Sequence, residues 1–133
     1  GGGADYLYGG GAADQMYGGA GRDILRGDVG SDVFWFDDGD YAGLTNATAD
    51  RIVDFSQGAD IIDLSLTDAV AGGADNAFVF IGTGAFTGLA GQLRYEQASG
   101  VTLILGDTNG DSVADIAIAL TGTVGLNAID FEL

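Results

Sequence analysis

A nine-residue repeat near the N-terminus constrains this chain more than any other feature. The copies read GGGADYLY at Gly1–Tyr8, GGGAADQMY at Gly9–Tyr17, GGAGRDILR at Gly18–Arg26 and GDVGSDVFW at Gly27–Trp35. Each copy has a glycine-rich turn, then an aspartate, then a triplet with an apolar middle residue. Such short strands are stable only when neighbours stack on them, so the repeat predicts a parallel β-solenoid with two copies per full turn.

The middle residue of each triplet is expected to face the inside of the coil. These residues are Leu7, Met16, Leu25 and Phe34, and successive copies place them on alternate sheets. The interior that they form is thin, and a solenoid this short buries little apolar surface. Its stability therefore needs a contribution besides hydrophobic burial.

The aspartates of the repeat have a spacing that suits a metal ion. Turns on the same edge of the coil are eighteen residues apart, so Asp5 faces Asp23 and Asp14 faces Asp32. Calcium takes about six to eight oxygen ligands, which carboxylates and carbonyls of two stacked turns can supply. The repeat also matches the calcium-binding nonapeptide G-G-x-G-x-D-x-U-x. Aspartates that only solvate turns are the alternative, but turn preference does not explain the strict phase.

The charge of the chain favours cations as partners. Its formal net charge is −16, with four basic residues and no histidine, so nucleic acid and anionic membranes are poor partners. Every acid except Glu96 and Glu132 is aspartate, whose short side chain suits tight loops lined with oxygen. The absence of cysteine excludes thiol chemistry and cysteine-bound metals. No apolar run approaches the roughly 20 residues of a membrane span, so no membrane insertion is expected.

The chain is expected to be the C-terminal portion of a longer protein. It opens inside a repeat, with Gly1 at the second position of a nonapeptide. It has neither an initiator methionine nor a basic N-terminal signal region. We therefore expect a further domain upstream in the same polypeptide.

Short strands are predicted after a loop at Phe36–Asp50. The acids of that loop, Asp37, Asp38, Asp40 and Asp50, either close the last metal sites or form a solvated acidic loop. The predicted strands are Arg51–Phe55, Ile61–Leu64, Ala77–Ile81, Gln92–Glu96, Val101–Leu105, Asp115–Leu120 and Ala128–Phe131. No segment has the pattern of a long helix, so the predicted fold class is all-β.

Alternation along the strands predicts which residues face the core. Leu93 is expected inside and Gln92 outside. Phe86 and Leu89 are expected to anchor the glycine-rich loop Gly82–Gly91 on the core.

A second candidate ion site lies between two predicted strands. It contains Asp107, Asn109, Asp111 and Asp115, and its first three oxygen-bearing residues alternate as at the start of an EF-hand loop. Glycine stands at the fourth position instead of the sixth, and Ile118 replaces the final glutamate, so an ion would need Asp115 as a substitute ligand. An Asx-rich hairpin turn without an ion is the equal alternative.

The repeats are typical of RTX proteins, and the later segments resemble the C-terminal module of the serralysin family of secreted bacterial metalloproteases. The matching segments are Asp50–Ser65 (DRIVDFSQGADIIDLS), Ala85–Gly100 (AFTGLAGQLRYEQASG), Gly106–Leu120 (GDTNGDSVADIAIAL) and the ending AIDFEL. The resemblance implies a calcium-binding parallel β-roll, expected at residues 1–40, packed on an antiparallel β-sandwich, expected at 41–133. It also implies a type I secretion signal in the C-terminal region, which includes Asp130–Leu133.

The resemblance further implies a ligand set for the roll, in which each calcium takes carbonyls and the aspartates of turns two repeats apart. One site would contain Gly1, Gly3, Asp5, Gly18, Ala20 and Asp23. The opposite edge would supply Gly10, Ala12, Asp14, Gly27, Val29 and Asp32. A third half-site would consist of Gly19, Gly21 and Asp23, with partners from Asp37–Asp40.

Two departures from the repeat, and two later acids, complete this set of expectations. Ala12 and Asp28 stand where the pattern has glycine, so the second site is expected to be strained or altered. Asp50 and Asp54 are further candidate metal ligands, and Asp60 flanks the same turn as Asp54.

The sequence predicts a module without catalysis of its own. The absence of histidine excludes the H-E-x-x-H zinc site of a metalloprotease and Ser-His-Asp catalysis. The resemblance implies an extracellular module that folds on binding calcium and directs type I secretion of an upstream metalloprotease domain. The alternative is a calcium-stiffened adhesion or interaction module of a secreted or surface RTX protein, with Tyr6, Tyr8 and Tyr17 available to a partner.

Overall fold

The computed structural model describes all 133 residues as an all-β chain with one short helical turn. The strands are β1 (Tyr6–Gly11), β2 (Gln15–Tyr17), β3 (Ile24–Val29), β4 (Val33–Asp37), β5 (Asp50–Ile52), β6 (Ile61–Leu66), β7 (Val79–Phe80), β8 (Gln92–Ala98), β9 (Val101–Asp107), β10 (Ile116–Thr121) and β11 (Phe131–Glu132). The turn is the 3₁₀ helix η1 (Ala128–Asp130). No helix of the structure has the length and apolarity to cross a bilayer. The predicted fold class is confirmed.

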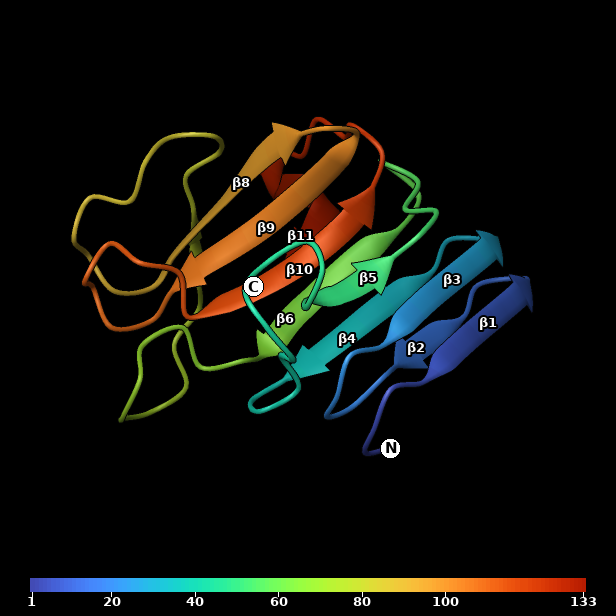
Figure 1. Cartoon of the computed structure of the whole chain (residues 1–133), viewed down its shortest axis with the longest axis horizontal. Coiled ribbons are helices and arrows are strands. Elements are labelled where there is room, and N and C mark those ends of the chain that lie inside the picture. Colours follow the sequence, from blue (N-terminus) through green and yellow to red (C-terminus); the bar gives the residue numbers. More distant parts are fainter.

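The strands form two sheets that lie face to face (Figure 1). The larger sheet has the order β1-β3-β5-β10-β9-β8-β7, and the smaller has the order β11-β6-β4-β2. All pairs of the smaller sheet are parallel, whereas antiparallel pairs are confined to β8, β9 and β10. The N-terminal coils occupy one end of this two-layer body, and the β8–β9 hairpin occupies the other (Figure 1).

The repeats coil as their spacing predicts. Leu7 pairs with Leu25 in the larger sheet, and Met16 pairs with Phe34 in the smaller one. Met16, Leu25 and Phe34 belong to one hydrophobic cluster between the sheets, and partly buried Leu7 packs against it. The predicted interior positions of the triplets are therefore confirmed.

The sheets of the roll continue past residue 40 without a break. β5 pairs with β3, which places Ile52 beside Leu25, and β6 pairs with β4, which places Ile62 beside Phe34. β10 then lies parallel to β5 on one side and antiparallel to β9 on the other. The roll thus shares both of its sheets with the later strands, and the division into domains at residues 1–40 and 41–133 stays a prediction.

The later strands depart from the predicted pattern at several places, and β5 and β7 are shorter than the predicted strands Arg51–Phe55 and Ala77–Ile81. Gln92 is buried, because its side chain exchanges hydrogen bonds of 2.8 and 2.9 Å with Thr87. Leu89 is 64% exposed and does not anchor its loop, whereas Phe86 does pack against a small cluster on the outer face of β9 and β10. The last segment begins as the turn η1, with only Phe131 and Glu132 in a strand, because Asp130 accepts a hydrogen bond from Asn127 that closes the turn.

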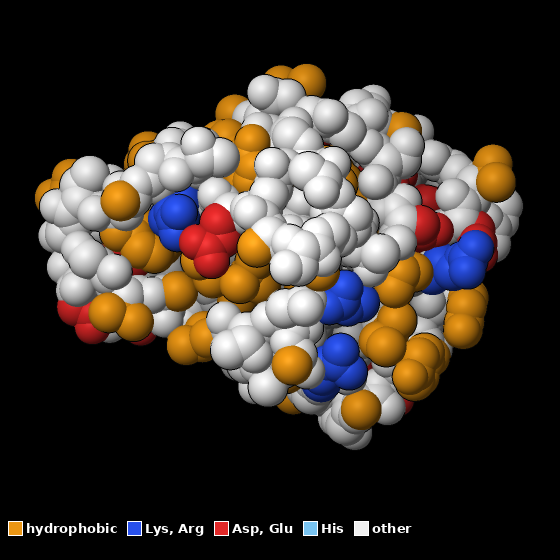
Figure 2. All heavy atoms as spheres, turned by 45° about the horizontal axis from the view of Figure 1, so that its top comes forward, with side chains coloured by type: hydrophobic (Ala, Val, Ile, Leu, Met, Phe, Trp, Pro, Cys, Tyr) orange, Lys and Arg blue, Asp and Glu red, His pale blue; other side chains and the backbone are white.

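The visible surface is less acidic than the net charge suggests. On the face in Figure 2, basic side chains stand among hydrophobic ones and acidic groups cover little area. Several aspartates are instead buried, among them Asp23, Asp32 and Asp50, each 1% exposed. Buried carboxylates are costly without a partner, so their surroundings are the first place to look for a site.

The continuous core gives a first prediction. Leu25 is fully buried at the centre of the shared cluster, so Leu25→Ala should lower the free energy of unfolding in calcium by about 2–5 kcal/mol. The matched control is Tyr8→Ala on the neighbouring strand, where the side chain is 68% exposed and little loss is expected. Denaturant unfolding monitored by circular dichroism measures both, and equal losses would contradict the described core.

Candidate metal centre

Aspartates stack on both edges of the roll through backbone hydrogen bonds. On one edge, the N–H of Asp5 donates to Oδ1 of Asp23 at 2.8 Å, and the N–H of Asp23 donates to Oδ1 of Asp50 at 2.7 Å. Each carboxylate therefore reaches back to the preceding coil. The facing pair Asp5 and Asp23 is brought together as the repeat predicts, and Asp50 extends the stack by one coil.

The opposite edge has the same construction. The N–H of Asp14 donates to Oδ1 of Asp32 at 2.9 Å, and the N–H of Asp32 donates to Oδ1 of Asp60 at 3.0 Å. Asp60 thus occupies the position on this edge that Asp50 occupies on the other.

The second oxygen of most of these carboxylates has no partner. Oδ2 of Asp14, Asp23, Asp32 and Asp50 is buried and makes no hydrogen bond. No arginine pairs with any of these four residues, because the ion pairs of the chain involve Asp5, Asp28, Asp54 and Glu96. Buried, unpaired carboxylate oxygens are the donor set that a hard cation such as calcium requires.

Glycine is needed where the stacked turns approach each other. A Cβ added at Gly19 would collide with the carbonyl oxygen of Gly1, and one added at Gly21 would collide with that of Gly3. A Cβ at Gly18 would strike Oδ2 of Asp23. These glycines keep oxygen atoms of two turns close together, as an ion bound between the turns would need.

The carbonyls in the expected ligand set are of two kinds. The carbonyl of Gly18 accepts a hydrogen bond from the terminal ammonium of Gly1 (2.8 Å), and that of Ala20 accepts one from the N–H of Gly3 (2.7 Å). On the other edge, the carbonyl of Val29 accepts from the N–H of Ala12 at 2.8 Å. The carbonyls of Gly1, Gly3 and Ala12 instead lie against the glycines Gly19, Gly21 and Gly30 of the next coil.

The remaining members of the expected set lie at the same turns. Gly10 pairs with Asp28 where β1 meets β3, and a Cβ at Gly27 would strike Oδ2 of Asp32. No group of three or more acidic side chains converges on one point. Any ion between these turns would therefore depend on backbone carbonyls as well as on carboxylates.

The two residues that replace glycine adopt positive φ. Ala12 has φ of 132° and Asp28 has φ of 64°, so the strain expected on this edge is present in the backbone. Asp28 compensates in part, since its carboxylate accepts a hydrogen bond of 2.6 Å from Arg26. Ala12 has no side-chain interaction that offsets its conformation.

Other predicted ligands have their oxygens occupied. Both oxygens of Asp54 accept backbone hydrogen bonds, from Gly27 at 3.0 Å and Asp28 at 2.8 Å. Both oxygens of Asp60 do the same, from Asp32 and from Ser56 at 2.7 Å. These two carboxylates therefore satisfy backbone N–H groups at the end of this edge of the roll.

In the loop Asp37–Asp40, which was expected to complete the third half-site, the acidic side chains point in different directions. The carboxylate of Asp40 is buried and accepts from the N–H of Asp37 at 2.7 Å and from the Tyr17 hydroxyl at 3.3 Å. Asp38 turns away and accepts from the N–H of Asp68 at 3.0 Å. The residue that faces Asp23 on the next coil is Asp50, which the decayed repeat does not indicate.

The electrostatics of Asp50 reflect this setting. Burial raises the pKa of its carboxyl to about 6, against the hydrogen bond from the Asp23 N–H, which lowers it, and the charges of Asp23 and Asp40 add to the increase. A carboxylate in this position is therefore stabilised by any cation that binds beside it.

The side-chain oxygens of the loop at Asp107–Asp115 accept hydrogen bonds within the loop, mainly from backbone N–H groups. Asp107 is fully buried and accepts from the N–H groups of Gly110 (2.7 Å) and Ser112 (2.8 Å). Asp115 accepts from Thr108 through both its N–H and its hydroxyl. Asn109 accepts from the N–H of Asp111 at 2.9 Å. These contacts are those of an Asx-rich turn, and an ion in this loop stays a prediction.

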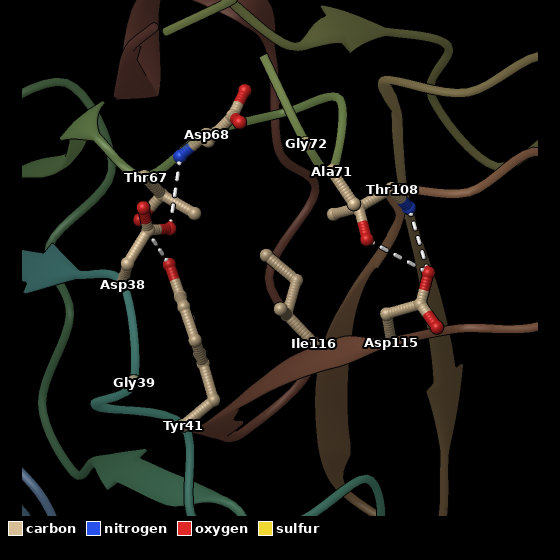
Figure 3. A pocket seen from close by; sticks show the side chains of 10 residues that line it. All are labelled: Asp38, Gly39, Tyr41, Thr67, Asp68, Ala71, Gly72, Thr108, Asp115 and Ile116. Carbon is tan, nitrogen blue, oxygen red and sulfur yellow. Dashed lines mark hydrogen bonds between the residues drawn. The ribbon is translucent and has the colours of Figure 1, made fainter. Parts of the chain in front are cut away.

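The largest cavity, of about 420 Å³, lies away from the stacked aspartates. Figure 3 shows Asp38 directed to Asp68, Tyr41 directed to Thr67, and Asp115 directed to Thr108 across its walls. Its acidic side chains already hold hydrogen bonds, so it lacks the unpaired oxygens of the roll.

The strained turn gives a second prediction. Ala12→Gly should raise the free energy of unfolding in calcium by about 1 kcal/mol, because glycine adopts φ of 132° without the steric penalty of a Cβ. The matched control is Ala4→Gly on the other edge, in a turn position without positive φ, where glycine should be neutral or destabilising. Thermal unfolding in excess calcium compares them, and a loss of stability in Ala12→Gly would show that the turn is not strained.

Comparisons with known proteins give results consistent with this geometry. Residues 9–132 match the family model described as peptidase M10 serralysin C terminal. The chain is 37% identical over 87 residues to metalloprotease AprA of Pseudomonas entomophila (strain L48), an alignment that covers 64% of this chain and 17% of that protein. The chain thus spans about a sixth of the length of this relative.

One solved structure shares the fold over almost the whole chain. The AlgE6R2 subunit of the mannuronan C5-epimerase from Azotobacter vinelandii superposes with a TM-score of 0.63 at 28% identity, covering 96% of this chain and 75% of that one. The two-layer arrangement is therefore shared with a subunit of an epimerase. The family match spans nearly all of the sequence, and the chain belongs to the serralysin C-terminal family.

Proposed function

We propose that this chain is a non-catalytic module that folds on binding calcium outside the cell and directs type I secretion of an upstream domain. The observation that carries the proposal is the set of buried, unpartnered Oδ2 atoms of Asp14, Asp23, Asp32 and Asp50. Membership of the serralysin C-terminal family supports the same assignment.

Calcium would act as a switch between compartments. Modules of this kind outside the cell bind calcium at roughly 10⁻⁴–10⁻³ M, well above cytosolic concentrations. Without the ion, the stacked carboxylates repel one another across the turns, so the chain stays unfolded and exportable inside the cell. Outside, binding to the folded state alone stabilises it by mass action.

The secretion signal would lie at the C-terminus. The candidate segment Asp130–Leu133 includes β11, whose Phe131 pairs with Ile62 of β6. In the folded chain this segment belongs to the smaller sheet, so a secretion machine would read it before folding. The relative AprA is a metalloprotease, which supports a protease as the domain upstream.

A second candidate is a calcium-stiffened interaction module of a secreted or surface protein. It is favoured by the exposure of Tyr6 (67%) and Tyr8 (68%) on the outer strand β1 and of Tyr17 (49%) on β2. The similarity to a subunit of an epimerase shows that this fold also accompanies enzymes other than proteases. The two candidates differ in whether the C-terminal segment carries cargo out of the cell.

Removal of calcium gives a third prediction. Chelation should abolish most of the β signal in circular dichroism, because the buried carboxylates lose their counter-charge. In a calcium titration, Asp32→Asn should raise the calcium midpoint at least about tenfold, since Asp32 contributes an unpartnered oxygen. The control Asp75→Asn, at an exposed loop position, should leave the midpoint unchanged. A chelated sample that keeps its full signal would refute calcium-coupled folding.

Export gives a fourth prediction. A reporter fused upstream of this chain should leave cells that carry a type I secretion machine, and removal of Asp130–Leu133 should stop export. The control is the exposed residue Ile129 changed to Ala, which should leave export intact because it lies outside the segment. Export that survives the removal would favour the interaction module.

A further inference from the structure

We propose that the outer face of the larger sheet binds an acidic polysaccharide through tyrosine and arginine side chains on β1, β3 and β5. The residues of this tyrosine–arginine ladder are Tyr6, Tyr8, Ile24, Arg26 and Arg51. The inference rests on the calcium-dependent fold of the proposed function, and it gives the interaction candidate a binding surface and a partner of stated chemistry. It concerns the outer face of the sheet and not the turns that carry the stacked aspartates.

The ladder has two rungs in register. Tyr6 pairs with Ile24, and Ile24 pairs in turn with Arg51, while Tyr8 pairs with Arg26 on the next rung. The residues that alternate with them along the strands belong to the core cluster or pack against it, so the ladder residues point outward. The two tyrosines are 67% and 68% exposed on the edge strand β1. Each rung thus presents an exposed aromatic ring at the edge and a guanidinium farther in.

The ladder gathers basic charge in a chain that has little of it. The chain has four basic residues against twenty acidic ones. Arg26 and Arg51 belong to the ladder, and Arg22 lies in the turn directly before β3. The fourth, Arg94, lies on β8 near the far end of the same sheet. Basic side chains accordingly stand among hydrophobic ones on the face in Figure 2. Charge complementarity therefore predicts an anionic partner for this face.

The guanidinium of Arg26 keeps donors for such a ligand. Its side chain is 51% exposed, and its ion pairs with Asp28 and Asp54 are both made through Nε. The two terminal nitrogens form no hydrogen bond with the chain, and they have the geometry that binds a carboxylate in a bidentate manner. Arg51 is held in place by the backbone carbonyl of Asn46, which accepts a hydrogen bond of 3.0 Å.

The size of the open face favours a narrow, extended partner. β1 and β3 have six residues each, so together they present a strip about 20 Å long and about 10 Å wide. The loop that contains Asn46 bounds this strip at Arg51. An area of about 200 Å² is far below the roughly 800 Å² per partner of a stable protein–protein interface. A polysaccharide chain fits such a strip, and tyrosine rings offer flat apolar surfaces on which sugar rings stack.

The spacing of the charges distinguishes an acidic polysaccharide from nucleic acid. Duplex DNA carries one negative charge about every 1.7 Å along its axis, and its binding depends on many basic contacts. The ladder offers one arginine per rung, with Asp5 before β1 and Asp28 near the end of β3. A polyuronate carries a single carboxylate on each sugar, and this sparser charge matches the arginines of the ladder.

The test measures binding of a galacturonic acid hexamer to the full chain by isothermal titration calorimetry, with excess calcium in both solutions. The hexamer should bind, and a neutral dextran oligomer of the same length should not. Arg26→Gln should weaken the affinity by about tenfold, because a charge-assisted hydrogen-bond pair is lost. The matched control is Arg94→Gln, which removes the same charge from the same sheet outside the ladder and should leave the affinity unchanged.

Tyr8→Ala tests the ladder without changing the charge. The side chain is 68% exposed, so the variant should fold, and binding should weaken severalfold because a stacking surface is lost. Circular dichroism in calcium confirms that each variant is folded. Equal losses for Arg26→Gln and Arg94→Gln would overturn the site. Tighter binding of hexaglutamate or of a short DNA oligonucleotide than of the uronate would overturn the proposed partner.

Failure of the ladder and failure of the proposed function have different readouts. A wild-type chain that is folded in calcium and binds no hexamer would overturn the ladder and leave calcium-coupled folding intact. A chain whose fold does not respond to calcium would refute the proposed function on which the inference rests.

Discussion

The structure depends on how the negative charge of its buried aspartates is compensated. Stacking the turns of the roll brings an aspartate of each coil against the backbone of the preceding one, and one oxygen of each is satisfied by an N–H group. The second oxygen is satisfied by nothing that the chain itself supplies. A single coil of this kind buries little apolar surface. Repulsion between the carboxylates of stacked turns is therefore large compared with the hydrophobic stabilisation of the coil. In the proposed function, a bound calcium ion would offset this repulsion and stabilise the stacked turns.

The two halves of the chain contribute unequally to the hydrophobic core. Near the N-terminus, the interior consists of one apolar side chain per triplet, whereas β8, β9 and β10 add Leu93, Ile104 and Ile118 to the same cluster. Because both sheets run through the boundary near residue 40, the later strands act as a cap on which the coils stack. The coils therefore extend the same pair of sheets as the later strands. The same two-layer arrangement is found in a subunit of a mannuronan C5-epimerase.

Much of the roll could be predicted from sequence because its period is strict. The nine-residue phase determines both the interior position of Leu25 and the meeting of Asp14 with Asp32, and the structure agrees. Asp50 was predicted as a candidate metal ligand, but its place beside Asp23 was not, since an insertion of nine residues between coils hides that pairing from any fixed period. The prediction that Gln92 faces outward was wrong. Alternation along a strand does not take account of its side-chain hydrogen bonds with Thr87, which offset the cost of burying a polar group. For loops rich in Asp and Gly, the sequence did not distinguish an ion site from a turn without an ion. Their side-chain oxygens can bind an ion or accept backbone hydrogen bonds, and only the contacts in the structure separate the two.

The most direct measurement of the central claim is a crystal structure of the chain grown in excess CaCl₂. The account predicts calcium between the stacked turns, with Oδ2 of Asp14 and Asp32 within about 2.3–2.6 Å of an ion. Well-ordered turns that hold no ion, with these oxygens paired to water or protein instead, would contradict it.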